Sequence, residues 1–207
     1  YEAATHMFKP SGKVNIKDDF YTQFIHTKSD GTVDVKHLEA LLDEDESIGL
    51  VSVMYVNNET GAVNPINHIG EICRDSGILF HTDCVQAAGC HPIDANIIGC
   101  DFATISGHKI YAPKGIGAIY IKDKTLARSL IYGGTNQEFG LRGGTENVAS
   151  IVGLGKACDL ICSDFGTQRV TVSLLKRLFY ENMTSYLKEL NLEDRIHVNG
   201  ASVGDVG

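Results

Sequence analysis

One run, GLVSVMYV at residues 49–56, constrains the fold more than any other stretch of the chain. It is almost continuously apolar and rich in β-branched residues, which is typical of a strand in a parallel sheet with both faces covered. GILFHTD at 77–83 and CDFATIS at 100–106 predict the next two strands. GIGAIYI at 115–121 follows so soon that no helical crossover fits, and we expect this fourth strand to run antiparallel to the third.

Helical patterns lie between and after these strands. They cover residues 32–45, residues 65–73, the segment that starts at Cys84, and two longer stretches near 147–163 and 168–190. Strands that alternate with helices are typical of an α/β domain. We expect a mostly parallel sheet with one antiparallel strand and helices on both faces.

The composition narrows the classes of function. The 207 residues are 43% apolar and 21% charged, which is typical of a globular protein with one sizeable core. The net charge of −8 argues against a general binder of nucleic-acid phosphates. No apolar run has the length needed to cross a membrane. We therefore expect neither direct nucleic-acid binding nor a membrane partner.

The cysteines and the chain ends carry two further expectations. The six cysteines include no C-x-x-C pair, and most of them lie inside apolar runs. This usage predicts a reduced, cytoplasmic protein. Because the chain begins at YEAATHMF without an initiating Met, we expect it to be part of a longer protein.

Polar side chains follow three consecutive predicted strands. Asn57 and Asn58 come after the first strand, Asp83 ends the second, and the segment from Ser106 to Lys109 ends the third. Ligands of open α/β sheets bind outside the carboxyl ends of the strands. The sequence therefore predicts a small-molecule site at this edge of the sheet.

Several ligand classes do not fit this edge. The chain has neither G-x-G-x-x-G after the first strand nor the P-loop pattern G-x-x-x-x-G-K-[ST]. Zinc is disfavoured, because His81 and Asp83 share one face of their strand whereas Cys84 lies on the other. The spacing of Cys84, Cys90 and His91 matches no standard zinc pattern, and we expect no metal.

Lys109 follows one predicted strand and Asp83 ends the neighbouring one. A lysine and an aspartate placed in this way suit the binding of pyridoxal 5'-phosphate. A lysine condenses with the aldehyde of this cofactor, and an acidic residue keeps the pyridine nitrogen protonated so that the ring withdraws electrons. Hydroxyl and imidazole groups near the same strand end can hold the phosphate.

Four stretches together resemble the cysteine desulfurases, the NifS/IscS-like group of class V aminotransferase-fold enzymes. They are VNNETGAVNPI, FHTDCVQAAG, DFATISGHKIYAPKGIGAIYI and GLRGGTENVASIVGLGKA, and they cover most of residues 31–160 in unbroken order. The resemblance implies the type I, aspartate-aminotransferase-like fold of pyridoxal-phosphate-dependent transferases. It places residues 1–145 in the large cofactor-binding domain, 146–190 in linking helices and 191–207 at the start of a small C-terminal domain.

The resemblance also implies roles around the cofactor ring. Lys109 would bear the cofactor covalently and move the substrate α-proton. Asp83 would pair with the ring nitrogen, and it can also serve as the N-cap of the helix predicted from Cys84. Gln86 would hydrogen-bond the phenolic oxygen, with Asn58 close by, whereas Asn57 can serve as the turn residue of NNETG.

Further roles concern the phosphate and the ring face. Ser106 and His108 would hold the phosphate. Thr145 resembles the threonine that family dimers lend to the phosphate of the second subunit, or else it caps the helix that starts at Glu146. His6 is the best match to the histidine that stacks on the ring and acts in acid/base catalysis. His81 is interpreted as a strand histidine with satisfied hydrogen bonds.

The implied reaction takes sulfur from L-cysteine, leaves L-alanine, and makes an enzyme persulfide for sulfur-acceptor proteins, as in iron–sulfur cluster assembly. Family members place the persulfide cysteine and the arginine for the substrate carboxylate farther along the chain, and none of the six cysteines here matches that position. GGTNQE replaces the usual GGGQE, and the upstream Gly-Thr phosphate loop is missing.

A homodimer is expected. The alternatives are a selenocysteine lyase, another class V enzyme, or a non-catalytic scaffold.

Overall fold

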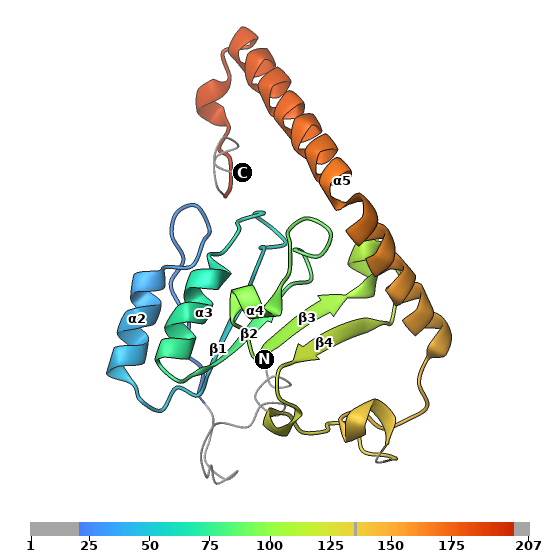
Figure 1. The fold of residues 1–207 in the computed structure, drawn as a ribbon. Helices are drawn as coiled ribbons and strands as arrows, with labels where there is room; N and C mark the ends of the chain where they lie inside the picture. Colours follow the sequence, from blue (N-terminus) through green and yellow to red (C-terminus); the bar gives the residue numbers. More distant parts are fainter. Residues whose placement is uncertain (1–20, 135, 201–207) are drawn as a thin grey trace.

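The computed structural model describes residues 21–134 and 136–200. Its centre is a mixed sheet with the strand order β1-β2-β3-β4 (Figure 1). β1, β2 and β3 are parallel, whereas β4 is antiparallel to β3. The four strands are Leu50–Met54, Leu79–Asp83, Phe102–Ser106 and Gly117–Ile121. The four predicted strands and the antiparallel direction of the last one are confirmed.

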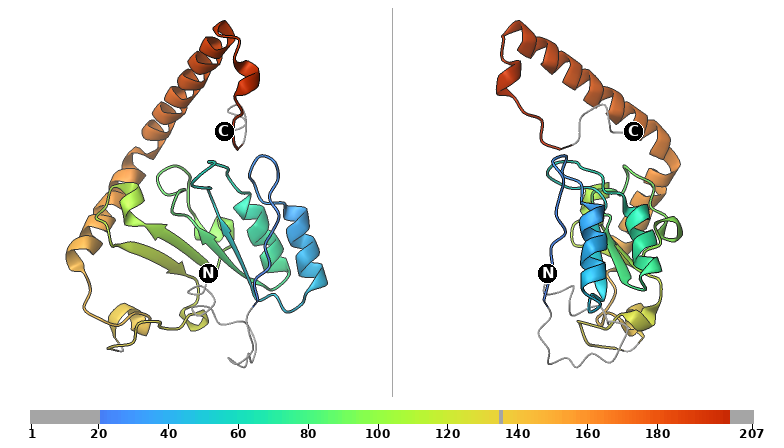
Figure 2. Two further views of the ribbon diagram at one scale, coloured as in Figure 1. Left: turned by 180° about the vertical axis from the view of Figure 1, so that it is seen from behind. Right: turned by 90° about the vertical axis from the view of Figure 1, so that its left-hand side faces the viewer.

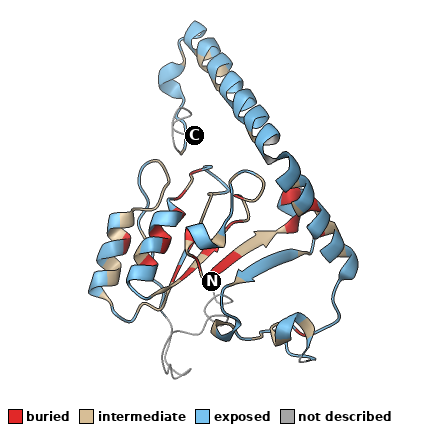
Figure 3. Cartoon of the chain, in the orientation of Figure 1, coloured by how far each residue is buried: buried red, intermediate tan, exposed pale blue. Residues whose placement is uncertain are grey.

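The main hydrophobic core lies between the sheet and helix α3 (Ile66–Asp75). Val51 and Val53 of β1 are buried on this side, in register with Phe80 and Thr82 of β2. Figure 3 shows that buried residues gather where α3 faces the sheet, whereas β4 is exposed along most of its length. Removal of this apolar surface from water, at roughly 25 cal/mol per Å², drives the packing of helix on sheet.

Helix α2 (Val35–Glu44) forms the outer part of this core, as the pattern over residues 32–45 predicted. The Asp34 side chain accepts a hydrogen bond from the backbone N–H of Lys36 (3.0 Å) and so caps the helix. Leu38 is buried in the same cluster as the α3 side chains.

The prediction of a helix starting at Cys84 is wrong. Residues 84–90 form a series of turns, in which the Cys84 carbonyl accepts two backbone N–H groups at 2.9 and 3.1 Å. Gly89 has a φ of +84°, a left-handed conformation that stops a helix. The next helix is the single turn α4 (Ala95–Ile98), which the Asp94 side chain caps.

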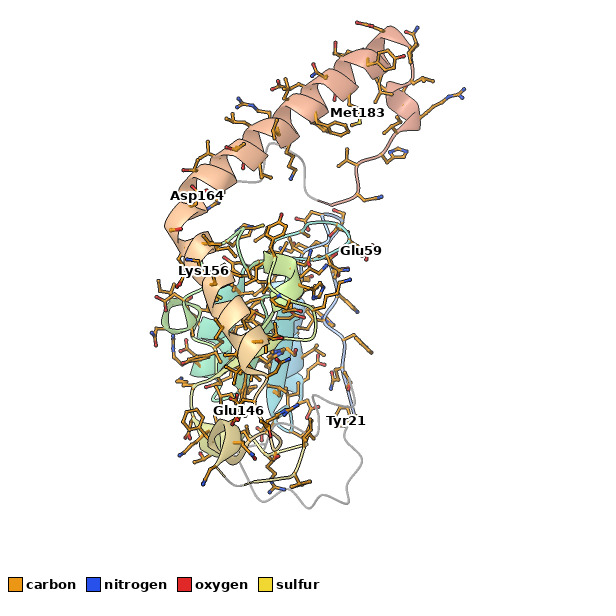
Figure 4. All side chains as sticks on the ribbon, turned by 90° about the vertical axis from the view of Figure 1, so that its right-hand side faces the viewer. Tyr21, Glu59, Glu146, Lys156, Asp164 and Met183 are labelled. Carbon is orange, nitrogen blue, oxygen red and sulfur yellow. The ribbon has the colours of Figure 1, made fainter. Side chains whose placement is uncertain are left out.

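The two long helices predicted near 147–163 and 168–190 are one element, α5 (Val148–Glu189). Asp164 interrupts it with φ −125° and ψ 15°, which lie outside the helical region. In Figure 4 the first half, which carries Lys156, runs beside the sheet, and α5 bends at Asp164. The second half extends away from the sheet in every view of Figures 1 and 2.

Four short 3₁₀ turns complete the described chain: η1 (Gly107–Ile110), η2 (Lys124–Leu126), η3 (Gln137–Gly140) and η4 (Glu193–Arg195). Among residues 21–134 and 136–200, no helix combines the length and the apolar character that a bilayer span requires.

Candidate active site

The carboxyl ends of the three parallel strands meet at one edge of the sheet. Met54 of β1 is in register with Asp83 of β2, and Asp83 is in register with Thr104 of β3. The segments that follow these residues therefore leave the sheet side by side. This strand order places Asp83 and the turn from Ser106 to Lys109 at the edge for which the sequence predicted a small-molecule site.

Asp83 ends β2 and fixes the turn that follows. Its Oδ1 accepts a hydrogen bond from the backbone N–H of Val85 at 2.8 Å. The alternative role of Asp83 as a helix N-cap is wrong, because no helix directly follows β2 and this bond closes a turn. Because a carboxylate accepts at both oxygens, this bond leaves Oδ2 able to face a cationic ring nitrogen.

Gln86 carries an unsatisfied polar atom in the same turn. Its Oε1 is buried and has no hydrogen-bond partner among the described residues. Leaving a buried polar atom unpaired costs about 1–3 kcal/mol, so this atom calls for a partner that the described residues do not supply. The same amide carries the Nε2 group, which can donate a hydrogen bond. A side-chain amide here fits the phenolic oxygen of pyridoxal phosphate.

Gly107 and Ile110 hold the η1 turn that presents Lys109. A Cβ on Gly107 would lie only 2.8 Å from Cγ2 of Ile116, so a residue with a side chain does not fit there. Ile110 is buried against Leu154 of α5. Lys109 lies between these two anchors in η1 and is itself exposed, so its charge is not buried.

Ser106 and His108 contact each other beside Lys109. The Ser106 hydroxyl lies 2.8 Å from Nδ1 of His108. His108 is exposed, and the pair presents a hydroxyl and an imidazole at the end of β3. Both groups can donate to phosphate oxygens. The structure therefore brings together two of the residues that the sequence assigns to the phosphate.

Asn57 and Asn58 have different surroundings. The Asn57 Oδ1 accepts the backbone N–H groups of Glu59 and Thr60, each at 2.9 Å, which makes Asn57 the turn residue. Asn58 is exposed, and its amide donates to the Glu59 carboxylate at 2.8 Å. The interpretation of Asn57 as the turn residue of NNETG is confirmed.

Thr145 lies in an exposed segment just before α5. Asn147, and not Thr145, caps this helix, because its Oδ1 accepts from the backbone N–H of Ser150 at 3.3 Å. The alternative reading of Thr145 as the helix cap is therefore wrong. His6 lies outside the described residues.

His81 bridges three strands and was assigned no site role. Its Nδ1 lies 2.8 Å from the Ser52 hydroxyl, and its Nε2 lies 3.3 Å from the Thr104 hydroxyl. Burial lowers the pKa of His81, and the nearby Asp83 charge opposes this effect. Satisfied hydrogen bonds were predicted for His81, and they are confirmed. The polar residues Ser52 and Thr104 inside apolar strands were the signal that this connection existed.

The six cysteines are all free thiols. Burial raises the pKa of Cys73 to about 12 and the pKa of Cys84 and of Cys100 to about 11, so these three stay protonated at neutral pH. Cys90 and Cys162 are exposed. The described residues contain no group of histidine, cysteine and acidic side chains that could hold a metal ion.

The mixed sheet, the surrounding helices and the likeness to solved NifS-like proteins define an α/β protein with the type I fold of pyridoxal-phosphate-dependent transferases. The chain belongs to the class V aminotransferase family, whose profile (Aminotransferase class-V) matches residues 9–199. Members of this family depend on pyridoxal phosphate.

Individual relatives show which members of this family the chain is similar to. The chain is 40% identical over 176 residues to the cysteine desulfurase IscS of Clostridium botulinum, a match that covers 85% of this chain and 44% of that protein. A NifS-like protein from Rickettsia africae superposes with a TM-score of 0.74 at 36% identity, over 78% of this chain and 45% of the other.

A third structure, described as SspA in complex with cysteine, gives a TM-score of 0.60 at 40% identity, over 67% of this chain and 39% of the other. The chain thus spans less than half the length of each of these relatives.

Proposed function

We propose that the protein is a pyridoxal-phosphate-dependent cysteine desulfurase, which takes sulfur from L-cysteine, leaves L-alanine and passes the sulfur on through an enzyme persulfide. The observation that carries this proposal is the exposed Lys109, held by two buried anchors at the edge where Asp83 ends the neighbouring strand. The relatives named cysteine desulfurase and the relative described with bound cysteine support the choice of substrate.

The residues at this edge fit the cofactor. Asp83 keeps one carboxylate oxygen for the ring nitrogen, and Gln86 has a buried amide atom without a partner. When bound, pyridoxal phosphate supplies an electron-withdrawing ring that stabilises negative charge at the substrate α-carbon. The Lys109 amine would hold the cofactor aldehyde in the resting protein, and its Nζ, once released by the incoming substrate amine, would accept the α-proton. The negative charge of Asp83 keeps the ring nitrogen protonated.

The remaining residues orient and complete the site. Ser106 and His108 donate to the phosphate, and Asn58 lies near the phenolic oxygen. In a homodimer, Thr145 reaches the phosphate of the second subunit, and His6 stacks on the ring and takes part in proton transfer. None of the six cysteines of this chain is assigned the persulfide.

A homodimer accounts for aromatic side chains that the described chain leaves in water. Tyr111, Tyr132 and Phe139 are 97%, 87% and 82% exposed, and they offer apolar surface that a second subunit could cover. We place the protein in the cytoplasm, with sulfur-acceptor proteins as partners and iron–sulfur cluster assembly as one destination of the sulfur. In this proposal, residues 1–145 belong to the large cofactor-binding domain and residues 146–190 are helices that link it to a small C-terminal domain. Residues 191–207 begin that small domain.

The direct test is the conversion of L-cysteine to L-alanine by the full-length protein in the presence of a thiol reductant. We expect Lys109→Ala to lower the rate at least about a hundredfold, because it removes the group that moves the α-proton. Lys114→Ala, at an exposed lysine five positions along, is the control and keeps the rate. Alanine formed from selenocysteine alone would establish the lyase instead, and alanine from neither substrate would contradict both.

A further inference from the structure

His81 connects all three parallel strands through side chains on one face of the sheet. It lies in direct register with Ser52 of β1, and it reaches diagonally to Thr104 of β3. We call Ser52, His81 and Thr104 the sheet clamp. The clamp lies on the face opposite to Val53 and Phe80, whose side chains pack in the main core, because neighbouring residues of a strand point to opposite faces.

The sheet clamp is close to Asp83 in two ways. His81 precedes Asp83 by two residues, so both side chains lie on the same face of β2. Thr104, the far end of the clamp, is the register partner of Asp83 on β3. A shift of β3 relative to β2 would therefore break the link from His81 to Thr104 and move Asp83 relative to the Lys109 turn.

We propose that the sheet clamp positions Asp83 against the ring nitrogen of the cofactor, with His81 as a positioning residue that does not itself touch the substrate or the cofactor. This inference rests on the proposed function. The clamp fixes the distance between the ends of β2 and β3, where Asp83 and the Lys109 turn lie. Asp83 and Lys109 must bind opposite sides of one rigid ring, so this distance decides whether both can reach it.

The charge state of His81 also affects how strongly Asp83 can bind the ring nitrogen. An imidazolium two residues from Asp83 would compete with the ring nitrogen for the negative charge of the carboxylate. In the clamp the imidazole is half-buried between two hydroxyl groups, which can accept from or donate to a neutral ring in either tautomer. A neutral His81 leaves the Asp83 charge to the cofactor.

A clamp that only stabilises the sheet must be distinguished from one that positions Asp83. Thr104→Val keeps the branched shape of the side chain and removes the hydroxyl that His81 contacts. Thr82→Val is the matched control, because it makes the same chemical change on the same sheet. Thr82 is buried on the opposite face of β2, next to Asp83 in sequence. Ser52→Ala tests the other end of the clamp at an exposed position that tolerates truncation.

The measurement uses the full-length protein loaded with pyridoxal phosphate that carries ¹⁵N in its ring. The ¹⁵N chemical shift reports directly whether the ring nitrogen holds a proton, and a pH titration gives the midpoint at which the proton is lost. We expect Thr104→Val to lower this midpoint by at least about half a pH unit, and Ser52→Ala to lower it in the same direction. We expect Thr82→Val to leave it unchanged, even if it lowers thermal stability.

Turnover gives a second readout. Thr104→Val should reduce kcat by on the order of tenfold with little change in KM, a smaller loss than the roughly hundredfold cost of a misplacement by 1 Å. Equal midpoints for Thr104→Val, Ser52→Ala and the wild type would overturn the clamp proposal and leave the proposed function standing. Failure of the wild-type protein to bind the cofactor would overturn both.

Discussion

Gly107 donates its backbone N–H to the carbonyl oxygen of Ile116 at 2.9 Å, and this bond joins the turn that carries Lys109 to the start of β4. The same contact leaves no space for a side chain. A Cβ on Gly107 would lie 2.8 Å from Cγ2 and 3.0 Å from the carbonyl oxygen of Ile116. The position of Lys109 therefore depends on the absence of a methyl group two residues before it.

We predict that Gly107→Ala lowers the free energy of unfolding by about 1–3 kcal/mol, because the added methyl group overpacks the contact with Ile116. Denaturant unfolding of the variant and the wild type measures the difference. Gly155→Ala is the control, since Gly155 lies in α5 with open space around its Cα. The control should be neutral or slightly stabilising, because alanine favours helix over glycine. Equal stability of Gly107→Ala and the wild type would show that the turn tolerates a side chain.

Asp83→Asn separates the structural role of Asp83 from its charge. Asparagine keeps an oxygen that can accept from the backbone N–H of Val85, so the free energy of unfolding should change by less than about 1 kcal/mol. The loss of negative charge at the ring nitrogen should lower kcat on the order of a hundredfold. Unfolding curves and cysteine turnover on the same samples check both expectations. A large loss of stability with unchanged turnover would reverse the assignment.

Gln86→Met should have opposite effects on stability and on cofactor binding. Without the cofactor, the variant removes a buried oxygen that lacks a partner, so the free energy of unfolding should rise by about 1 kcal/mol. The same change removes the hydrogen bond to the cofactor, so the Kd of pyridoxal phosphate should increase about tenfold. Titration of the cofactor-free protein gives the Kd. A variant that is less stable and binds the cofactor normally would rule out this role for Gln86.

The cysteine pKa values predict how stability depends on pH. Burial raises the folded-state pKa of Cys73 to about 12 and that of Cys84 to about 11, from the ordinary value of 9.0. Between pH 9 and pH 12 the folded chain keeps thiol protons that the unfolded chain has lost. The stabilisation that comes from these protonated, buried thiols is therefore complete below pH 9 and is lost as the pH rises toward 12. Unfolding at a series of alkaline pH values measures the slope. Rapid alkylation of Cys73 at pH 8 would contradict the assignment, with the exposed Cys90 as the reactive control.

Periodicity along the sequence was sufficient for the strands and for the long helices. GLVSVMYV and GIGAIYI lie where β1 and β4 are found, because short apolar runs with β-branched residues, bounded by turn residues, favour strands. The segment after Asp83 was mistaken for a helix because VQAA has good helical propensity. The structure there follows the left-handed Gly89, which local propensity does not reveal.

For the site, the sequence was sufficient to propose some residues but not to predict the contacts between strands. Asp83, Ser106 and Lys109 could be proposed from the sequence because each lies at the end of an apolar strand or in the turn directly after it. The contacts of His81 with Ser52 and Thr104 join residues 29 and 23 positions apart, and they depend on the register of three strands. Sequence periodicity identifies the face on which each residue lies but not its neighbour on the next strand. The sequence therefore identified His81 as satisfied without naming the partners.

The most direct test of the central claim is reduction of the purified full-length protein with borohydride, followed by peptide mapping. Borohydride makes the bond between a lysine amine and the cofactor aldehyde permanent. We predict that the cofactor mass is found on Lys109 and that Lys109→Ala abolishes the label, whereas Lys114→Ala keeps it. A label on another lysine, or no label after addition of pyridoxal phosphate, would contradict the assignment of the strand edge as the cofactor site.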